Sequence, residues 1–116
     1  MAVKAYQTAQ RAAENPRNTE YRLFGQVTGA LIEAQAAGAK GVDLIDVLDW
    51  NRRLWSTLAV DCMDEGNKLS KELRAQIVSL SIWVTKYSSQ VMHQGASIQP
   101  LIDINRTIMQ GLQGSP

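Results

Sequence analysis

Apolar residues between positions 73 and 91 recur at alternating intervals of four and three, and this pattern constrains the fold more than any other feature of the chain. The positions are Leu73, Ile77, Leu80, Val84, Tyr87 and Val91. On an α-helix these intervals place all six side chains on one face. Ser70 is a suitable N-cap, and Gly95 is a suitable C-terminal stop. The pattern therefore predicts a long amphipathic helix whose apolar face must be covered by other helices.

Three further segments show helical periodicity. The first begins at Asn15-Pro16 and ends at Gly38, the second runs from Asp43 to Glu65, and the third begins at Gln99-Pro100. The apolar stripe of the first segment is Leu23, Phe24, Val27, Leu31 and Ala34, and that of the last is Leu101, Ile104, Ile108 and Leu112. No segment shows a competitive strand pattern. The sequence thus predicts an all-α fold, a compact bundle of about four helices.

The length fits one domain, which we expect to span residues 1–116. Residues 1–14 are rich in alanine and glutamine, so we expect a weak helix or an arm that orders only on a partner. Residues 113–116 are expected to form a flexible tail. Because 45% of the residues are hydrophobic, the chain can bury a core without a metal or a disulfide.

Charge and targeting signals exclude several classes of protein. The net charge of +1 gives no long-range field for nucleic acid or anionic lipid, so direct RNA binding is disfavoured. The stretch from Ile77 to Val84 is far too short to cross a bilayer, so no membrane insertion is expected. The first ten residues lack the apolar core of a secretion signal, and a single cysteine cannot form an internal disulfide. These features favour the cytoplasm.

Two groups of residues contain side chains that could carry chemistry. Cys62 and His93 are the only thiol and the only imidazole, but a lone cysteine on an apolar helical face is usually buried, and no third catalytic group accompanies them. Asp43, Asp46 and Asp49 recur every three residues without a further ligand at metal spacing. We therefore predict no catalytic residue, no metal site and no cofactor.

The bundle has more apolar surface than its core stripes explain. In the second helix the apolar arc covers about 220°, and it includes Trp50, Leu54, Leu58, Leu44, Trp55, Ile45 and Met63. The third helix carries Val78 and Ile82 away from its stripe, and the fourth carries Ile102 and Met109. A central helix packed on all sides would also be apolar nearly all round. The alternative is an open groove that receives an amphipathic partner helix.

Seven residues are the candidates for binding such a partner: Gly25, Gly29, Trp50, Leu54, Val78, Ile82 and Trp83. The two glycines lie one turn apart inside the first helix, where each costs about 1 kcal/mol relative to alanine. A bare patch of this kind allows close approach of another backbone, either a partner or an internal neighbour.

Several segments of the chain resemble the flagellar biosynthesis regulator FlaF family. They are residues 15–21, 27–31, 51–55, 73–80, 83–84 and 101–109, of which Asn51-Arg-Arg-Leu-Trp55 and Leu101-Ile-Asp-Ile-Asn-Arg106 are the most recognisable. The resemblance extends from about residue 5 to residue 112. It implies a non-enzymatic bacterial protein of the cytoplasm that is needed for flagellin production and export, and that acts alongside FlbT, an opposing regulator that restrains flagellin synthesis.

The resemblance leaves two mechanisms open. In the first, the protein is a secretion chaperone that binds flagellin, and the surplus apolar surface covers an amphipathic terminal helix of flagellin. In the alternative, the protein regulates translation of flagellin mRNA, either directly through Arg52, Arg53 and Arg106 or through FlbT. The sequence does not decide the oligomeric state.

Overall fold

Four α-helices account for the regular structure in the part of the chain that the computed structural model describes, which is residues 16–113, with side chains described for residues 18–112. The helices are α2 (Pro16–Ala37), α3 (Gly41–Met63), α4 (Lys71–Gln94) and α5 (Gln99–Gln113). The predicted all-α fold is confirmed. The predicted N-terminal arm (1–14), the cap at Asn15 and residues 114–116 of the predicted tail lie outside the described residues.

Local sequence signals set most helix ends. The Ser70 hydroxyl accepts a hydrogen bond from the backbone N–H of Leu73 at 3.1 Å, so it caps α4 as predicted. Gly38 and Gly95 follow α2 and α4 with φ angles of 61° and 68°, the left-handed conformation that glycine adopts without steric cost. In contrast, α3 begins two residues before the predicted Asp43 and ends at Met63 rather than Glu65.

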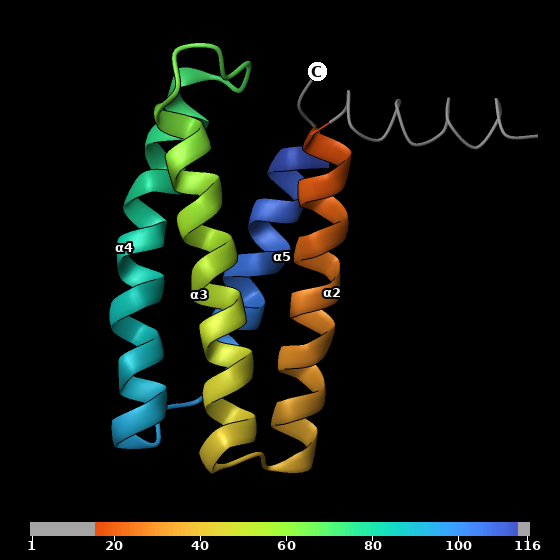
Figure 1. Cartoon of the computed structure of the whole chain (residues 1–116), viewed down its shortest axis with the longest axis vertical. Helices are drawn as coiled ribbons and strands as arrows, with labels where there is room; N and C mark the ends of the chain where they lie inside the picture. The colour runs from red at the N-terminus through yellow and green to blue at the C-terminus, as the bar shows by residue number, and fades with distance from the viewer. Residues whose placement is uncertain (1–15, 114–116) are drawn as a thin grey trace, which may run out of the picture.

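The helices are arranged as three in front and one behind (Figure 1). In this view α4, α3 and α2 lie side by side, and α5 crosses behind them. α3 contacts both α4 and α2, whereas α5 packs mainly against α2 and makes fewer contacts with α4. One side of α4 is therefore less covered than it would be in a symmetric four-helix bundle.

The core is built from the predicted stripes. Fully buried members include Phe24, Leu31, Trp55, Ile77 and Leu101, one or more from each helix. The Phe24 and Trp55 rings meet edge to face with centroids 5.4 Å apart, an arrangement that aromatic quadrupoles favour. The residues at the edges of the stripes, such as Leu73, Leu80, Tyr87 and Ile104, are only partly buried against this core.

A chain of buried polar side chains joins α3 to α5. The indole N–H of Trp55 donates to Asn105 Oδ1 at 2.8 Å, and Asn105 Nδ2 donates to Asn51 Oδ1 at 2.8 Å. Both asparagines are completely buried. Buried amides are stabilising only where they find such partners, so this network fixes how α5 sits across α3.

The structure corrects two sequence expectations about α5. The sequence predicts that Ile102 and Met109 are surplus surface residues, but Ile102 is 1% exposed and Met109 packs against the core. Because α5 packs mainly against α2, its second apolar side covers α2 instead of facing a partner. None of the described helices is long and apolar enough to cross a membrane.

Candidate functional site

Trp50 and Leu54 lie on the side of α3 that points away from α4. Arg52 lines the space between α3 and α4, and a residue two positions away on a helix points about 200° from it. Trp50 is 37% exposed, and Leu54 is partly buried against the core. These two candidate residues therefore lie toward α2, the other neighbour of α3.

Val78 and Ile82 lie on the side of α4 that borders α3. Thr85 and Ser89 line the space between these helices, and Val78 and Ile82 each precede one of them by two helical turns. Val78 packs partly against the core, whereas Ile82 is 57% exposed. Ile82 is thus the more accessible of the pair.

Trp83 lies on the opposite side of α4. It points about 200° away from Thr85, because it is two residues earlier in the same helix. Its ring stacks on Tyr87 with centroids 4.9 Å apart and planes 14° apart. The Tyr87 hydroxyl donates to the backbone carbonyl of Ser97 at 2.7 Å, just before α5. The pair is therefore held in place, while Trp83 keeps 37% of its surface exposed.

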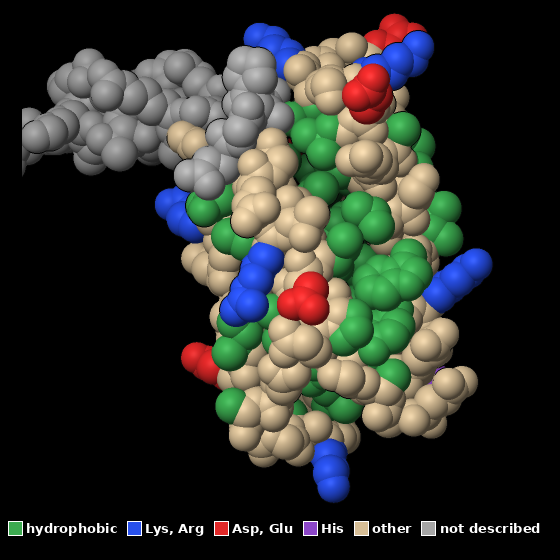
Figure 2. Space-filling view, turned by 180° about the vertical axis from the view of Figure 1, so that it is seen from behind, with side chains coloured by type: hydrophobic (Ala, Val, Ile, Leu, Met, Phe, Trp, Pro, Cys, Tyr) green, Lys and Arg blue, Asp and Glu red, His purple; other side chains and the backbone are tan. Residues whose placement is uncertain are grey.

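The neighbouring side of α5 completes an apolar surface with this pair. A Cβ placed on Gly111 would lie 3.5 Å from Leu73 Cδ1, so this side of α5 faces α4. Ile104 precedes Gly111 by two turns, and Leu80 follows Leu73 by two turns, which puts both on the facing sides. We call Leu73, Leu80, Trp83, Tyr87 and Ile104 the α4–α5 apolar surface. Figure 2 shows a band of hydrophobic side chains on the rear face of the molecule, the face on which α5 lies.

The two glycines of α2 do not share one environment. A Cβ on Gly25 would lie 3.6 Å from Met109 Cε, so α5 is the neighbour that approaches this position. Nothing lies within 4 Å of a Cβ placed on Gly29. The close packing of α5 thus explains why a small residue occupies position 25. No contact among the described residues explains the glycine at position 29.

The seven candidate residues therefore do not form one surface. Trp50 and Leu54 lie toward α2, Val78 and Ile82 lie toward α3 on α4, and Trp83 faces the side of α5. Sequence reasoning overlooked Leu80, Tyr87 and Ile104 as surface residues, because their heptad-like spacing assigns them to a core stripe. The missing signal is that α5 packs mainly on α2, which no local pattern in the sequence reveals.

Cys62 and His93 are far apart. Arg74, near the start of α4, donates from Nε to the backbone carbonyl of Cys62 at 2.7 Å, and His93 lies 19 residues further along the same helix. At 1.5 Å per residue that is about 28 Å. Burial, with a smaller contribution from Glu20, raises the pKa of the Cys62 thiol to about 11. The two groups cannot act as a thiol-imidazole pair.

Three charged residues of α3, Asp49, Arg52 and Arg53, pair with one another. Asp49 accepts from Arg52 Nη2 and lies 3.1 Å from Arg53 Nε. The hydrogen bond from Arg52 lowers the pKa of Asp49 below its ordinary value. Among residues 16–113 no cluster of three histidine, cysteine or acidic side chains can hold a metal ion. Arg106 lies on α5, and the other two arginines that are candidates for RNA contact, Arg52 and Arg53, both pair with Asp49.

The comparison with protein-family models decides the family. The model described as flagellar protein FlaF matches residues 2–112, nearly the whole chain. The chain is a member of the FlaF family. The family resemblance inferred from the sequence is thus confirmed, and FlaF-family membership makes this a flagellar protein. The comparisons with curated proteins and with solved structures returned no match.

Proposed function

We propose that this FlaF-family protein promotes flagellin synthesis and secretion by binding flagellin in the cytoplasm as an export chaperone. The α4–α5 apolar surface covers one amphipathic terminal helix of flagellin. The observation that carries this proposal is the stacked Trp83–Tyr87 pair, which a hydrogen bond from Tyr87 to Ser97 ties to the start of α5 and which leaves Trp83 partly exposed on a protein of a flagellar family. Tryptophan and tyrosine dominate the energetics of protein interfaces.

The geometry of the surface suits a helix. Leu73 and Tyr87 are separated by 14 residues of α4, which is about 21 Å, or nearly four turns of a helix lying alongside. None of the five side chains of the surface is charged, and Figure 2 shows the charged side chains bordering the band. An amphipathic helix laid on this face would bury its apolar side and leave its polar side in water.

The effect on flagellin synthesis follows from binding. A protein that removes free flagellin, or that engages FlbT, changes the translation of flagellin without contacting its mRNA. This route does not require the arginines of α3, which already pair with Asp49. It also couples the supply of flagellin to its export.

The test is co-purification of the full chain with full-length flagellin and with flagellins truncated at either end. We expect full-length flagellin to be retained, and retention to be lost when the terminal helix that docks is removed. Unchanged affinity after truncation of both ends would show that the docking mechanism is wrong.

A pair of variants places the interaction on the molecule. Trp83→Ala should weaken flagellin binding about 10-fold, because the exposed part of an aromatic anchor is lost. Val60→Ala is the matched control, since Val60 is 63% exposed but belongs to α3, outside the α4–α5 apolar surface. If Trp83→Ala and Val60→Ala bind flagellin equally well, flagellin does not bind to the α4–α5 apolar surface.

A further inference from the structure

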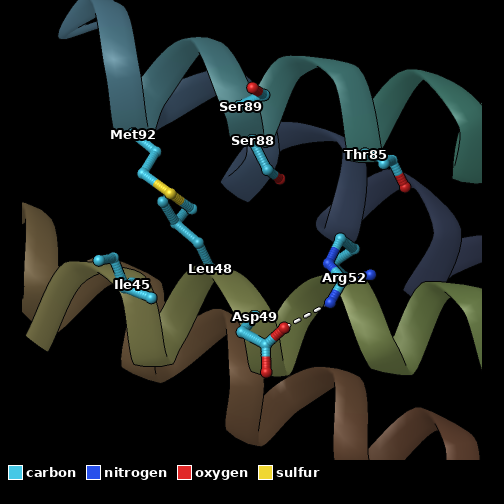
Figure 3. Close-up of a pocket in the computed structure, with 8 residues that line it drawn as sticks. All are labelled: Ile45, Leu48, Asp49, Arg52, Thr85, Ser88, Ser89 and Met92. Atoms are coloured by element: carbon cyan, nitrogen blue, oxygen red, sulfur yellow. Dashed lines mark hydrogen bonds and ion pairs between the residues drawn. The ribbon is translucent and has the colours of Figure 1, made fainter. Parts of the chain in front are cut away.

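A pocket of about 300 Å³ opens between α3 and α4. In Figure 3 Leu48 and Met92 meet and close one end of it, with Ile45 beside them. At the other end Arg52 rises from α3 toward Thr85. Leu48 and Arg52 are four residues apart on α3, which is about one helical turn, or 6 Å. The pocket therefore has an apolar end and a polar end that one small molecule can reach together.

The polar end carries more positive than negative charge. Asp49 accepts from Arg52 through Oδ1, and its Oδ2 lies 3.1 Å from Arg53 Nε, so one carboxylate is shared between two guanidinium groups. One positive charge of this group is therefore not compensated. The charged residues next along the two walls, Asp46 on α3 and Lys86 on α4, are opposite in sign and leave the sum unchanged. In the described part of the chain Arg52 donates through Nη2 alone, so its other N–H groups can bind an anion.

Ser88 offers an unused hydrogen-bond donor to the same pocket. It is 3% exposed, and its Oγ has no hydrogen-bond partner among the described residues. In Figure 3 the side chain points from α4 into the space between the two helices. A helical hydroxyl can donate to the carbonyl one turn earlier, as Thr85 does to Ser81. The Ser88 hydroxyl does not, so it can donate to an oxygen of a molecule in the pocket.

These features define the chemistry of the ligand. A carboxylate carries the single negative charge that balances the surplus arginine, and its two oxygens accept from a guanidinium and a hydroxyl at once. The apolar end favours a ligand that also has a short alkyl chain. Such a chain rests on the outer side of the closed Leu48–Met92 contact, beside Ile45, which is 43% exposed.

We propose that this pocket binds a small aliphatic carboxylate. One carboxylate oxygen meets the Arg52 guanidinium, and the other accepts a hydrogen bond from Ser88 Oγ. The alkyl chain covers the exposed side of Ile45. This binding site is separate from the α4–α5 apolar surface, and it does not depend on flagellin.

Binding is tested by NMR titration of the ¹⁵N-labelled full chain with hexanoate at constant pH and ionic strength. We expect saturable shifts of the amides of Leu48, Arg52 and Ser88, at about millimolar affinity. Three comparators separate the parts of the ligand: 1-hexanol keeps the chain without the charge, acetate keeps the charge without most of the chain, and inorganic phosphate is an anion without a chain. Each comparator should bind at least about 3-fold more weakly than hexanoate.

Two pairs of variants place the carboxylate in the pocket. Arg52→Gln should weaken hexanoate binding about 10-fold, because a charge-assisted hydrogen bond is lost. Arg106→Gln removes the same charge from an exposed position of α5 and should leave binding unchanged. Ser88→Ala should weaken binding about 3- to 10-fold. Ser79→Ala is its control, because Ser79 is an exposed serine of the same helix about 180° from Ser88.

The protein fold is not at risk in the decisive variant. Ser88→Ala removes a buried hydroxyl that has no partner, so the Tm of the free protein should not fall, and weaker binding cannot then be ascribed to unfolding.

Several outcomes overturn the proposal. Equal binding of 1-hexanol shows an apolar site only, and equal binding of acetate or phosphate shows a general anion site without a place for the alkyl chain. Hexanoate binding that Arg52→Gln or Ser88→Ala leaves unchanged places the ligand elsewhere, and the lack of a saturable shift shows that the pocket binds no such carboxylate. Because flagellin takes no part in the titration, none of these results bears on the chaperone proposal.

Discussion

Replacing Asn105 by alanine should destabilise the fold severely, because this side chain holds two buried partners at once. Its removal leaves the Trp55 indole N–H without an acceptor and Asn51 Oδ1 without a donor, in a site where all three residues are fully buried. Each orphaned buried group costs about 1–3 kcal/mol, and the space left by the amide adds a cavity term. We expect a loss of about 3–6 kcal/mol, a large part of the stability of a domain of this size.

Asn51→Ala is the matched control in the same network. It leaves only Asn105 Nδ2 unpartnered, and it removes Asn51 Nδ2, which has no partner in the structure. The removal of the unpartnered Asn51 Nδ2 offsets much of the cost of leaving Asn105 Nδ2 unpartnered, so we expect Asn51→Ala to lower the free energy of unfolding by about 0–2 kcal/mol. Urea unfolding followed by far-UV circular dichroism measures both. Refutation would come from Asn105→Ala costing no more than Asn51→Ala.

Three further predictions test other parts of the account. Burial raises the pKa of Cys62 to about 11, so about one thiol in a thousand is ionised at pH 8. Iodoacetamide should therefore label Cys62 only after the protein unfolds. Rapid labelling of the folded chain would show that the Cys62 thiol is not buried. Gly29→Ala should raise stability by about 0.5–1 kcal/mol, since nothing in the described chain meets the new Cβ, and thermal unfolding that shows destabilisation would be against it. The lowered pKa of the Asp49 carboxyl contributes stability at pH values above the pKa that this carboxyl has in the unfolded chain, and the contribution is lost as the pH falls through its pKa in the folded protein. Arg52→Gln should move the pKa of Asp49 toward 3.8 in a carboxyl NMR titration. An unchanged pKa would show that Arg52 is not the cause of the shift.

The sequence predicts the helices well, because their signals are local. The heptad-like stripe from Leu73 to Val91, the Ser70 cap and the glycines at 38 and 95 each act within a few residues of where they appear. The start of α3 differs because Lys40 provides no side-chain cap, so no sequence signal marks that end.

The packing of α5 was not predictable in the same way. Periodicity gives the apolar sides of a helix but not the neighbour that covers each side. Ile102 and Met109 were therefore assigned to the surface, whereas one is buried and the other fills the space over Gly25. For the same reason Leu80, Tyr87 and Ile104 were assigned to the core, although they are only partly buried. Asn51 and Asn105 were recognised as family positions, but their hydrogen bond to each other joins residues 54 positions apart.

The most direct test of the central claim, that flagellin binds to the α4–α5 apolar surface, is an NMR titration of the labelled full chain with unlabelled, monomeric flagellin. We predict that the perturbed signals gather at Leu80, the indole of Trp83, Tyr87 and Ile104, with the outer side of α3 around Val60 unaffected. Perturbations confined to α2 and α3 around Trp50, or none at saturating flagellin, would contradict the account.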